Sequence, residues 1–251
     1  MRQIILAINA LLKFKAYTLI NVLGLACSLA CVLTVARYIH QENTVNQCFP
    51  EYKRICLIKT STSSGENFLG GYRSGLEKNP DVEQFTVIYQ ISDMPVLFGE
   101  QEIAANAFSV DSTFFKIFPY RVIAGSGRIV RPRDVVITRS FWKKKLGGKN
   151  AIGATFKNTK GNKFTIIGVV DDPDTKTSWM PDIFMSDELD EFLFFDPIYA
   201  MLMAPDTDIA LLNKKYSKEH PRSKWSTYET VRYQYLPLKD LYYDKDHGIV
   251  Y

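Results

Sequence analysis

The side chains that could perform chemistry do not form a familiar catalytic motif. A nucleotide-binding loop needs GxxxxGK followed by Ser or Thr, and the nearest candidate, Gly148-Lys149-Asn150, lacks both the first glycine and the hydroxyl. His40, His220 and His247 lie far apart, and none belongs to an HExxH zinc-protease motif. No serine lies in a GxSxG motif. We therefore expect no catalytic residue, no cofactor and no metal site, and a chain that is not an enzyme.

An acidic cluster is the candidate for cation binding. Asp171, Asp172 and Asp174 could offer carboxylate oxygens to Ca²⁺. An EF-hand loop counted from Asp172 would need Gly at its sixth position and Glu at its twelfth, but these are Thr177 and Ile183. A turn that closes the preceding strand also explains the cluster, and we favour the turn.

Lysines and cysteines give two weaker signals. Residues 143–145 are three lysines in a predicted short helix, and we interpret them as its solvated face. Cys48 and Cys56 are eight positions apart, and they could form a disulfide in an oxidising compartment or remain two thiols. Cys27 and Cys31 lie in an apolar segment and cannot form a soluble metal site.

The charge of the chain is concentrated at its beginning. Arg2, Lys13, Lys15 and Arg37 precede the first acidic residue, Glu42. The remaining Lys and Arg are equal in number to the 27 Asp and Glu, so the formal net charge of +4 belongs to the first forty residues. A neutral body argues against a nucleic-acid-binding protein, which normally has a strongly basic face.

An uncharged segment of 21 residues at positions 16–36 predicts a transmembrane helix. As a helix it would be roughly 31 Å long, which is close to the thickness of the hydrocarbon layer. A cleaved signal peptide, a lipoprotein signal and a buried helix of a soluble protein are the alternatives, and we favour a retained anchor. We place this helix at residues 16–39 and an interfacial amphipathic helix at residues 1–15.

The basic flank before the span predicts its orientation. By the positive-inside rule the N-terminus stays in the cytoplasm, and residues after about 40 lie outside the cytoplasmic membrane. Within the span, Asn21, Gly24, Ser28 and Cys31 recur at intervals of three, four and three. Such a stripe of small and polar residues allows another helix to pack closely, so we treat these four as the candidate helix-packing site.

Residues 40–251 predict an extracytoplasmic domain of the α+β class. Strands are predicted at residues 54–60, 85–91, 135–138, 155–158, 163–170 and 231–236. Helices are predicted at residues 70–78, at 112–118 after an Asp111 cap, at 140–146 before a Gly147-Gly148 stop, and around Ile209, Leu212 and Tyr216 after an Asp206 cap. Residues 187–205 fit no pattern clearly.

Several sequence blocks resemble the N-terminal half of MacB-like (FtsX-superfamily) ABC transporter permeases. They are LLKFKAYTLINVLGLACSLACVL at 11–33, FSVDSTFFKIFPYRVIAG at 108–125, VVITRSFWKKKLGGKNAIGATF at 135–156 and FTIIGVVDDPD at 164–174. LPLKDLYY at 236–243 resembles the segment of the family that returns to the membrane. The resemblance implies a protein of the bacterial inner membrane, with a first transmembrane helix and, after about residue 40, a periplasmic core domain of two mixed α/β subdomains.

The resemblance also implies partners and a mode of action. A partner ATPase binds the ATP and drives helix movements, and these pass to the outer domain for export or envelope mechanotransmission. The chain stops at Tyr251, before the remaining membrane helices of the family. We therefore expect a truncated or split permease that associates with an ABC ATPase and with other permease helices or a second copy. A membrane-tethered binding or adaptor domain without transport activity is the alternative.

Overall fold

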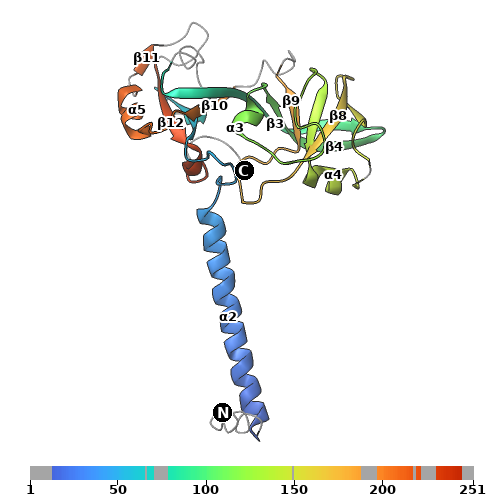
Figure 1. Cartoon of the computed structure of the whole chain (residues 1–251), viewed down its shortest axis with the longest axis vertical. Helices are drawn as coiled ribbons and strands as arrows, with labels where there is room; N and C mark the ends of the chain where they lie inside the picture. The colour runs from blue at the N-terminus through green and yellow to red at the C-terminus, as the bar shows by residue number, and fades with distance from the viewer. Residues whose placement is uncertain are drawn as a thin grey trace. The chain divides into compact units, whose positions relative to one another are not determined.

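A computed structural model describes residues 13–65, 67–70, 79–148, 150–187, 197–216, 219–221 and 230–244. The chain divides into two compact units, one up to Thr44 and one from Val45 onward. The first unit carries the candidate membrane span, and the second contains all the strands (Figure 1).

The first unit is built around a single helix, α2 (Lys15–Asn43). In the part of the chain that the structure describes, α2 is the one helix long and apolar enough to cross a membrane. It contains the predicted span and continues for seven residues beyond position 36. Its end is stabilised by Thr44, whose hydroxyl donates a hydrogen bond of 2.9 Å to the carbonyl oxygen of His40. The predicted interfacial helix falls largely on residues 1–12, outside the described residues.

In the residues that the structure describes, the second unit contains one mixed sheet of twelve strands with short helices, and its class is α+β as predicted. The strands are β1 (Ile55–Thr62), β2 (Asn67–Leu69), β3 (Val82–Phe98), β4 (Gln101–Val110), β5 (Val122–Gly125), β6 (Asp134–Thr138), β7 (Thr155–Asn158), β8 (Lys163–Val170), β9 (Ile183–Ser186), β10 (Ile198–Met203), β11 (Glu219–Pro221) and β12 (Thr230–Pro237). The helices are α3 (Phe114–Ile117), α4 (Arg139–Lys145), α5 (Ile209–Tyr216) and the 3-10 helix η3 (Leu238–Asp240). The strand order is β11-β12-β1-β10-β3-β4-β9-β6-β8-β5, with β2 on β1 and β7 on β3 and β8.

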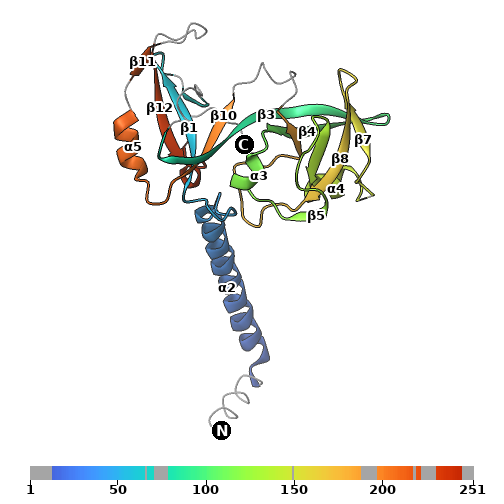
Figure 2. The same cartoon turned by 45° about the horizontal axis from the view of Figure 1, so that its top comes forward.

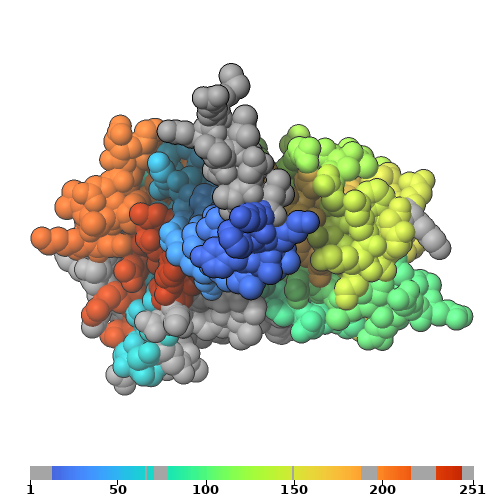
Figure 3. All heavy atoms as spheres, turned by 90° about the horizontal axis from the view of Figure 1, so that it is seen from below, coloured from blue at the N-terminus to red at the C-terminus, as the bar shows by residue number. Residues whose placement is uncertain are grey.

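Strand β3 is shared by two lobes of this unit. Its first half pairs antiparallel with β10, and its second half pairs with β4 and β7. Figure 2 shows β3 running from the side of β1, β10 and β12 to the side of β4, β7 and β8. In the space-filling view of Figure 3, the orange and red atoms of α5 and β12 lie on one side and the green to yellow atoms of the other lobe lie opposite.

Three groups of buried apolar side chains form the core. One group lies within the lobe of β1, β10 and β12 and includes Met201 and Tyr235, and a second lies within the other lobe and includes Phe156 and Phe164. The third draws residues from both lobes and is rich in aromatic side chains. Its aromatic members are Phe49, Phe108, Phe114, Phe118, Trp179 and Phe184. Because the third group contains residues of both lobes, it forms a hydrophobic core that the two lobes share.

Local signals predicted several elements well. The hairpin of β7 and β8 has the predicted bounds. Strand β6 and helix α4 begin within one residue of the prediction, and Gly147 and Gly148 follow α4 with φ values of 66° and 68°. The carboxylate of Asp111 accepts hydrogen bonds from the backbone N–H groups of Thr113 and Phe114, as expected for a cap. The predicted helix at 70–78 falls mostly on residues outside the described ranges.

Two predictions differ from the structure. Asp206 does not cap α5; Asp208 does, because it directly precedes the helix and its Oδ1 accepts hydrogen bonds from the N–H groups of Ala210 and Leu211. Asp206 instead lies in the preceding turn with a φ of 67°. The strand expected at 85–91 is also too short, since β3 extends from Val82 to Phe98.

Candidate functional site

The predicted helix-packing stripe lies on α2. Asn21, Gly24, Ser28 and Cys31 fall within about 80° of one another at 100° per residue and extend roughly 15 Å along the axis. The hydroxyl of Ser28 donates a hydrogen bond of 2.8 Å to the carbonyl oxygen of Gly24, so this group is satisfied within the helix. The side-chain amide of Asn21 has no hydrogen-bond partner among the described residues. A Cβ added at Gly24 would meet no atom within 4 Å.

A buried asparagine lies at the start of the second unit. Asn46 is fully buried, and its backbone has a φ of 63° in the left-handed region. Its Nδ2 donates hydrogen bonds to Ser178 Oγ at 2.9 Å and to the carbonyl oxygen of Leu238 at 3.0 Å. Its Oδ1 accepts from Thr177 Oγ1 at 3.0 Å and from the backbone N–H of Ser178 at 2.7 Å. These four bonds use every amide donor and two acceptor positions.

Asn46 therefore joins three segments that are distant in the sequence. Its backbone N–H also donates to the carbonyl oxygen of Lys176 at 2.9 Å. The three segments are the first residues of the second unit, residues 176–178 between β8 and β9, and η3 after the last strand. We call this set of contacts the Asn46 junction. Sequence reasoning missed it because a lone asparagine carries no motif.

The segment after β12 is held by a second set of polar contacts. The ammonium of Lys59 on β1 contacts both carboxylate oxygens of Asp244, at 2.8 and 2.7 Å. Both side chains are largely buried, at 9% and 15% exposed. The ammonium of Lys176 donates to the hydroxyl of Tyr242 at 2.5 Å and lies 4.3 Å from the centre of the Tyr242 ring. Ion pairing and ring contacts thus fix the last described segment to the domain.

The acidic cluster is an ion-paired turn. Asp171 forms salt bridges with Arg121 and with Arg139, the latter at 3.0 Å. Asp172 Oδ1 accepts a hydrogen bond of 3.3 Å from the backbone N–H of Ser140 at the start of α4. No group of three or more acidic, His or Cys side chains in the described residues could hold a metal ion. These contacts agree with a turn after β8 rather than with a calcium site.

The thiols of the second unit are protected from reaction. Cys48 and Cys56 are free thiols in the structure, so the alternative of a disulfide is not realised. Burial raises the pKa of Cys48 and raises the pKa of Cys56 to about 12. Because the thiolate is the reactive species, these cysteines are suited to packing and not to nucleophilic chemistry. Residues 143–145 lie exposed on α4, as predicted for a solvated face.

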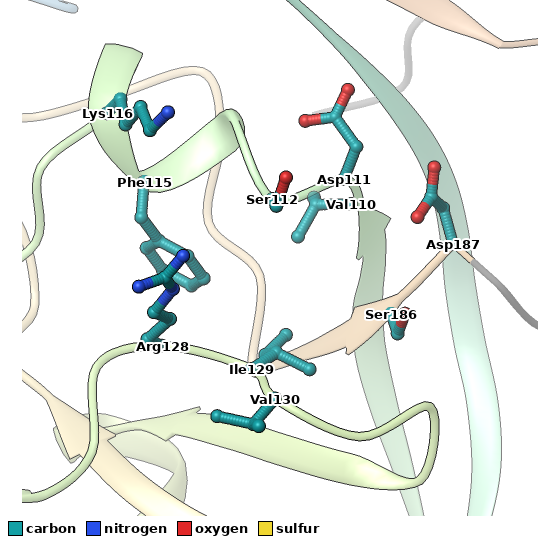
Figure 4. A pocket seen from close by; sticks show the side chains of 10 residues that line it. All are labelled: Val110, Asp111, Ser112, Phe115, Lys116, Arg128, Ile129, Val130, Ser186 and Asp187. Carbon is teal, nitrogen blue, oxygen red and sulfur yellow. The ribbon is translucent and has the colours of Figure 1, made fainter.

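A pocket of about 410 Å³ lies beside the ends of two parallel strands. Strands β4 and β9 pair in parallel, and Val110 lies opposite Ser186 at their carboxyl ends. Both residues line the pocket, together with residues of α3 and of the loop after β5 (Figure 4). No sequence motif predicted this site, because its lining comes from three separate segments.

The charged groups of this pocket differ in their contacts. The carboxylate of Asp111 accepts hydrogen bonds from Thr86 Oγ1 and from three backbone N–H groups, so it is satisfied within the fold. The ammonium of Lys116 and the guanidinium of Arg128 form no ion pair or hydrogen bond with any residue that the structure describes. Figure 4 shows Lys116, Phe115 and Arg128 on one side of the pocket and Asp111 and Asp187 on the other.

Comparison with known proteins places this arrangement in a family. The family model of the MacB-like periplasmic core domain matches residues 18–215. A domain of a protein described as a permease, from Porphyromonas gingivalis, has a similar structure with a TM-score of 0.59 and 18% identity, covering 75% of this chain and 91% of that one. The periplasmic region of MacB from Actinobacillus actinomycetemcomitans gives a TM-score of 0.50 and 15% identity, covering 68% and 83%.

At these identities the solved structures establish similarity of fold. No curated protein matches the sequence. The family match covers well over half of the chain and runs from inside α2 into α5. It therefore includes both the apolar helix and the greater part of the second unit. The resemblance seen in the sequence is confirmed: the chain belongs to the family of the MacB-like periplasmic core domain.

Proposed function

We propose that this chain is a membrane subunit, or a fragment, of an ABC transporter permease whose outer domain receives motion driven by a partner ATPase. The observation that carries the proposal is the family match at residues 18–215, because a single family model covers both the apolar helix and most of the outer domain. ATP is bound by the partner, since this chain has no nucleotide-binding loop. The movement serves export or envelope mechanotransmission.

The proposed topology follows from the charges that flank the helix. Residues 1–15 lie at the cytoplasmic surface, residues 16–39 cross the inner membrane, and residues 40–251 form the periplasmic core domain. Arg2, Lys13 and Lys15 keep the N-terminal side in the cytoplasm. The stripe of Asn21, Gly24, Ser28 and Cys31 packs against other permease helices or against a second copy of the chain.

The Asn46 junction supports a role in transmission. It lies three residues after the end of α2 in the chain, and it bonds the incoming segment to two others by side-chain and backbone contacts. A displacement of the chain at Val45 would therefore act on residues 176–178 and on η3 together. A freely hinged linker would not transmit motion in this way.

An alternative function is a membrane-tethered binding or adaptor domain without transport activity. One observation favours it, namely the pocket beside β4 and β9, in which Lys116 and Arg128 have no partner among the described residues. The two functions differ in whether an ATPase is stably associated with the chain.

Purification from native membranes tests the proposed function. A tagged full-length chain, extracted in mild detergent, should bring with it a protein that hydrolyses ATP and is inhibited by vanadate. The Gly24→Leu variant adds bulk on the packing stripe and should reduce the recovered ATPase, whereas Leu23→Ile, which lies off the stripe, is the matched control and should not. Recovery of the chain without any nucleotide-binding protein, in several detergents, would favour the adaptor function.

Topology is tested separately. A reporter fused after Tyr251 that is active only outside the cytoplasm should be active, and a cysteine placed at position 3 should resist membrane-impermeant thiol reagents until the membrane is opened. The Cys27→Ser, Cys31→Ser, Cys48→Ser, Cys56→Ser background removes the native thiols. Labelling of position 3 in intact cells would reverse the proposed orientation.

A further inference from the structure

The position of the pocket beside β4 and β9 is typical of a binding site. In sheets with parallel strands, ligands bind outside the carboxyl ends of the strands, where neighbouring connections diverge. Here β4 and β9 form a parallel pair within a mixed sheet, and the pocket lies beside the carboxyl ends of both strands. Its volume of about 410 Å³ is within the range of small-molecule sites.

The lining of the pocket combines unpaired positive charge with apolar surface. Lys116 comes from α3 and Arg128 from the loop after β5, and neither side chain has a partner among the described residues. The loop is fixed near Arg128, because its backbone N–H donates to Ser126 Oγ at 3.1 Å and the same hydroxyl donates to the Arg128 carbonyl oxygen at 3.0 Å. Phe115 and Val130 add apolar wall, and Val130 is 74% exposed although it is aliphatic.

The acidic groups of the pocket limit which ligands fit. Asp111 does not compete for the two cations, because its carboxylate is occupied by one hydroxyl and three backbone N–H groups. Asp187 lies on the side opposite Lys116 and Arg128 (Figure 4). A ligand with one anionic end can therefore place that end between the two cations.

We propose that this pocket binds a small organic carboxylate with an apolar body. The carboxylate lies between Lys116 and Arg128, and the body lies against Phe115 and Val130. This inference goes beyond the proposed function, since transmission of motion requires no ligand at this site. A fatty acid and the C-terminal residue of a peptide both combine a carboxylate with an apolar body, and the experiment distinguishes these two ligands.

Binding is measured on the full-length chain in lipid nanodiscs by ligand-observed NMR titration, with empty nanodiscs as the blank. Octanoate is the acyl probe and N-acetylphenylalanine is the peptide probe. Octanol and N-acetylphenylalanine amide are their uncharged counterparts. We expect at least one carboxylate to bind, with an affinity at least about fivefold higher than that of its uncharged counterpart. This difference in affinity should shrink as the salt concentration rises, because salt screens exposed charges.

Charge-neutral variants locate the site. Lys116→Gln and Arg128→Gln should each weaken carboxylate binding about fivefold, as expected for an exposed charge contact. Lys143→Gln on α4 is the matched control, because it removes a positive charge from an exposed position outside the pocket lining, and its affinity should equal that of the parent. Circular dichroism spectra should be the same for all three variants.

The possible outcomes each bear on the proposal. Binding of octanoate alone would identify the ligand as a fatty acid. Binding of N-acetylphenylalanine alone would identify it as the C-terminal residue of a peptide. Either outcome supports a carboxylate site. Equal binding of charged and uncharged probes would overturn the proposal. So would equal weakening by Lys116→Gln and Lys143→Gln, or no binding above that of empty nanodiscs.

Discussion

At the scale of the residue, Asn46 shows how one buried polar side chain can hold several segments together. Its contacts connect positions 131, 132 and 192 residues away in the chain. No local pattern can reveal such distances, so the sequence could not predict this junction. In contrast, the caps at Asp111 and Asp208 bond to backbone groups within three residues, so short-range rules are suited to finding them. The cap of α5 was nevertheless predicted two residues too early, at Asp206.

Replacing Asn46 should destabilise the second unit strongly. Asn46→Ala removes four side-chain hydrogen bonds and leaves buried partners unsatisfied, so we expect a loss of about 3 kcal/mol in the free energy of unfolding. Asn46→Gly loses the same bonds but tolerates the φ of 63°, so it should be about 1 kcal/mol less damaging. Urea unfolding of residues 45–251 measures both values. Stability equal to the parent in both variants would contradict a structural role for the junction.

Gly168 on β8 is required for a different reason, namely space. A Cβ at this position would lie 1.7 Å from the carbonyl oxygen of Ser126, so the backbone after β5 would have to move. We expect Gly168→Ala to lower the free energy of unfolding by about 3 kcal/mol. Gly161→Ala is the comparison, because its Cβ would meet no atom within 4 Å and only its φ of 80° is unfavourable, at about 1 kcal/mol. Equal losses in the two variants, measured by urea unfolding, would show that space at Gly168 is not limiting.

At the scale of the element, the sequence predicted best the segments that clear turn or cap signals bound. The β7–β8 hairpin was found because a glycine-containing turn separates two alternating segments. Strand β10 was missed; all six of its residues are buried, so it lacks the alternation that identifies a half-buried strand. Burial alone does not explain the miss, because β6 is equally buried and was predicted from the turn and cap signals around it. Strand β4 was also missed, although its first half alternates between exposed and buried residues. Strand β9 was missed as well, since its four residues alone are too few to show a pattern.

Helix α2 provides a prediction about association. A membrane helix with an unpaired amide and a small residue on one stripe gains from a close neighbour. In the Cys27→Ser, Cys48→Ser, Cys56→Ser background, crosslinking through Cys31 in native membranes should therefore occur, and Gly24→Leu should reduce it because it adds bulk to the stripe. Leu23→Ile is the matched control, since it lies off the stripe and conserves volume. Equal crosslinking in both variants, or none in the parent, would indicate a simple anchor.

At the scale of the whole molecule, the second unit has the features of an independently folding domain. Its formal net charge is only +1, and its lobes share a continuous core. The α+β class followed from the sequence, but the long β3 shared by both lobes did not, because pairing between distant strands has no local signature.

Residues 45–251 expressed alone should be monomeric and unfold cooperatively, because a chain of this size can bury a sufficient core. Residues 50–251 make the sharper comparison, since they lack only the first segment of the Asn46 junction and buried Phe49. We expect the shorter fragment to be less stable by several kcal/mol. Sedimentation and urea unfolding measure both properties. An aggregated longer fragment would mean that membrane helices or a partner complete the fold.

The hydrogen bond from Asn46 to the carbonyl oxygen of Leu238 has a consequence for how this domain could be built into other proteins. It holds the first segment of the second unit beside η3, which follows the last described strand, at 3.0 Å between donor and acceptor. A domain whose ends meet can interrupt a host polypeptide without separating the residues on either side of the interruption. The domain thus has the geometry of an insertable cassette, which can be gained, removed or exchanged within a host chain while the spacing of the flanking residues is preserved.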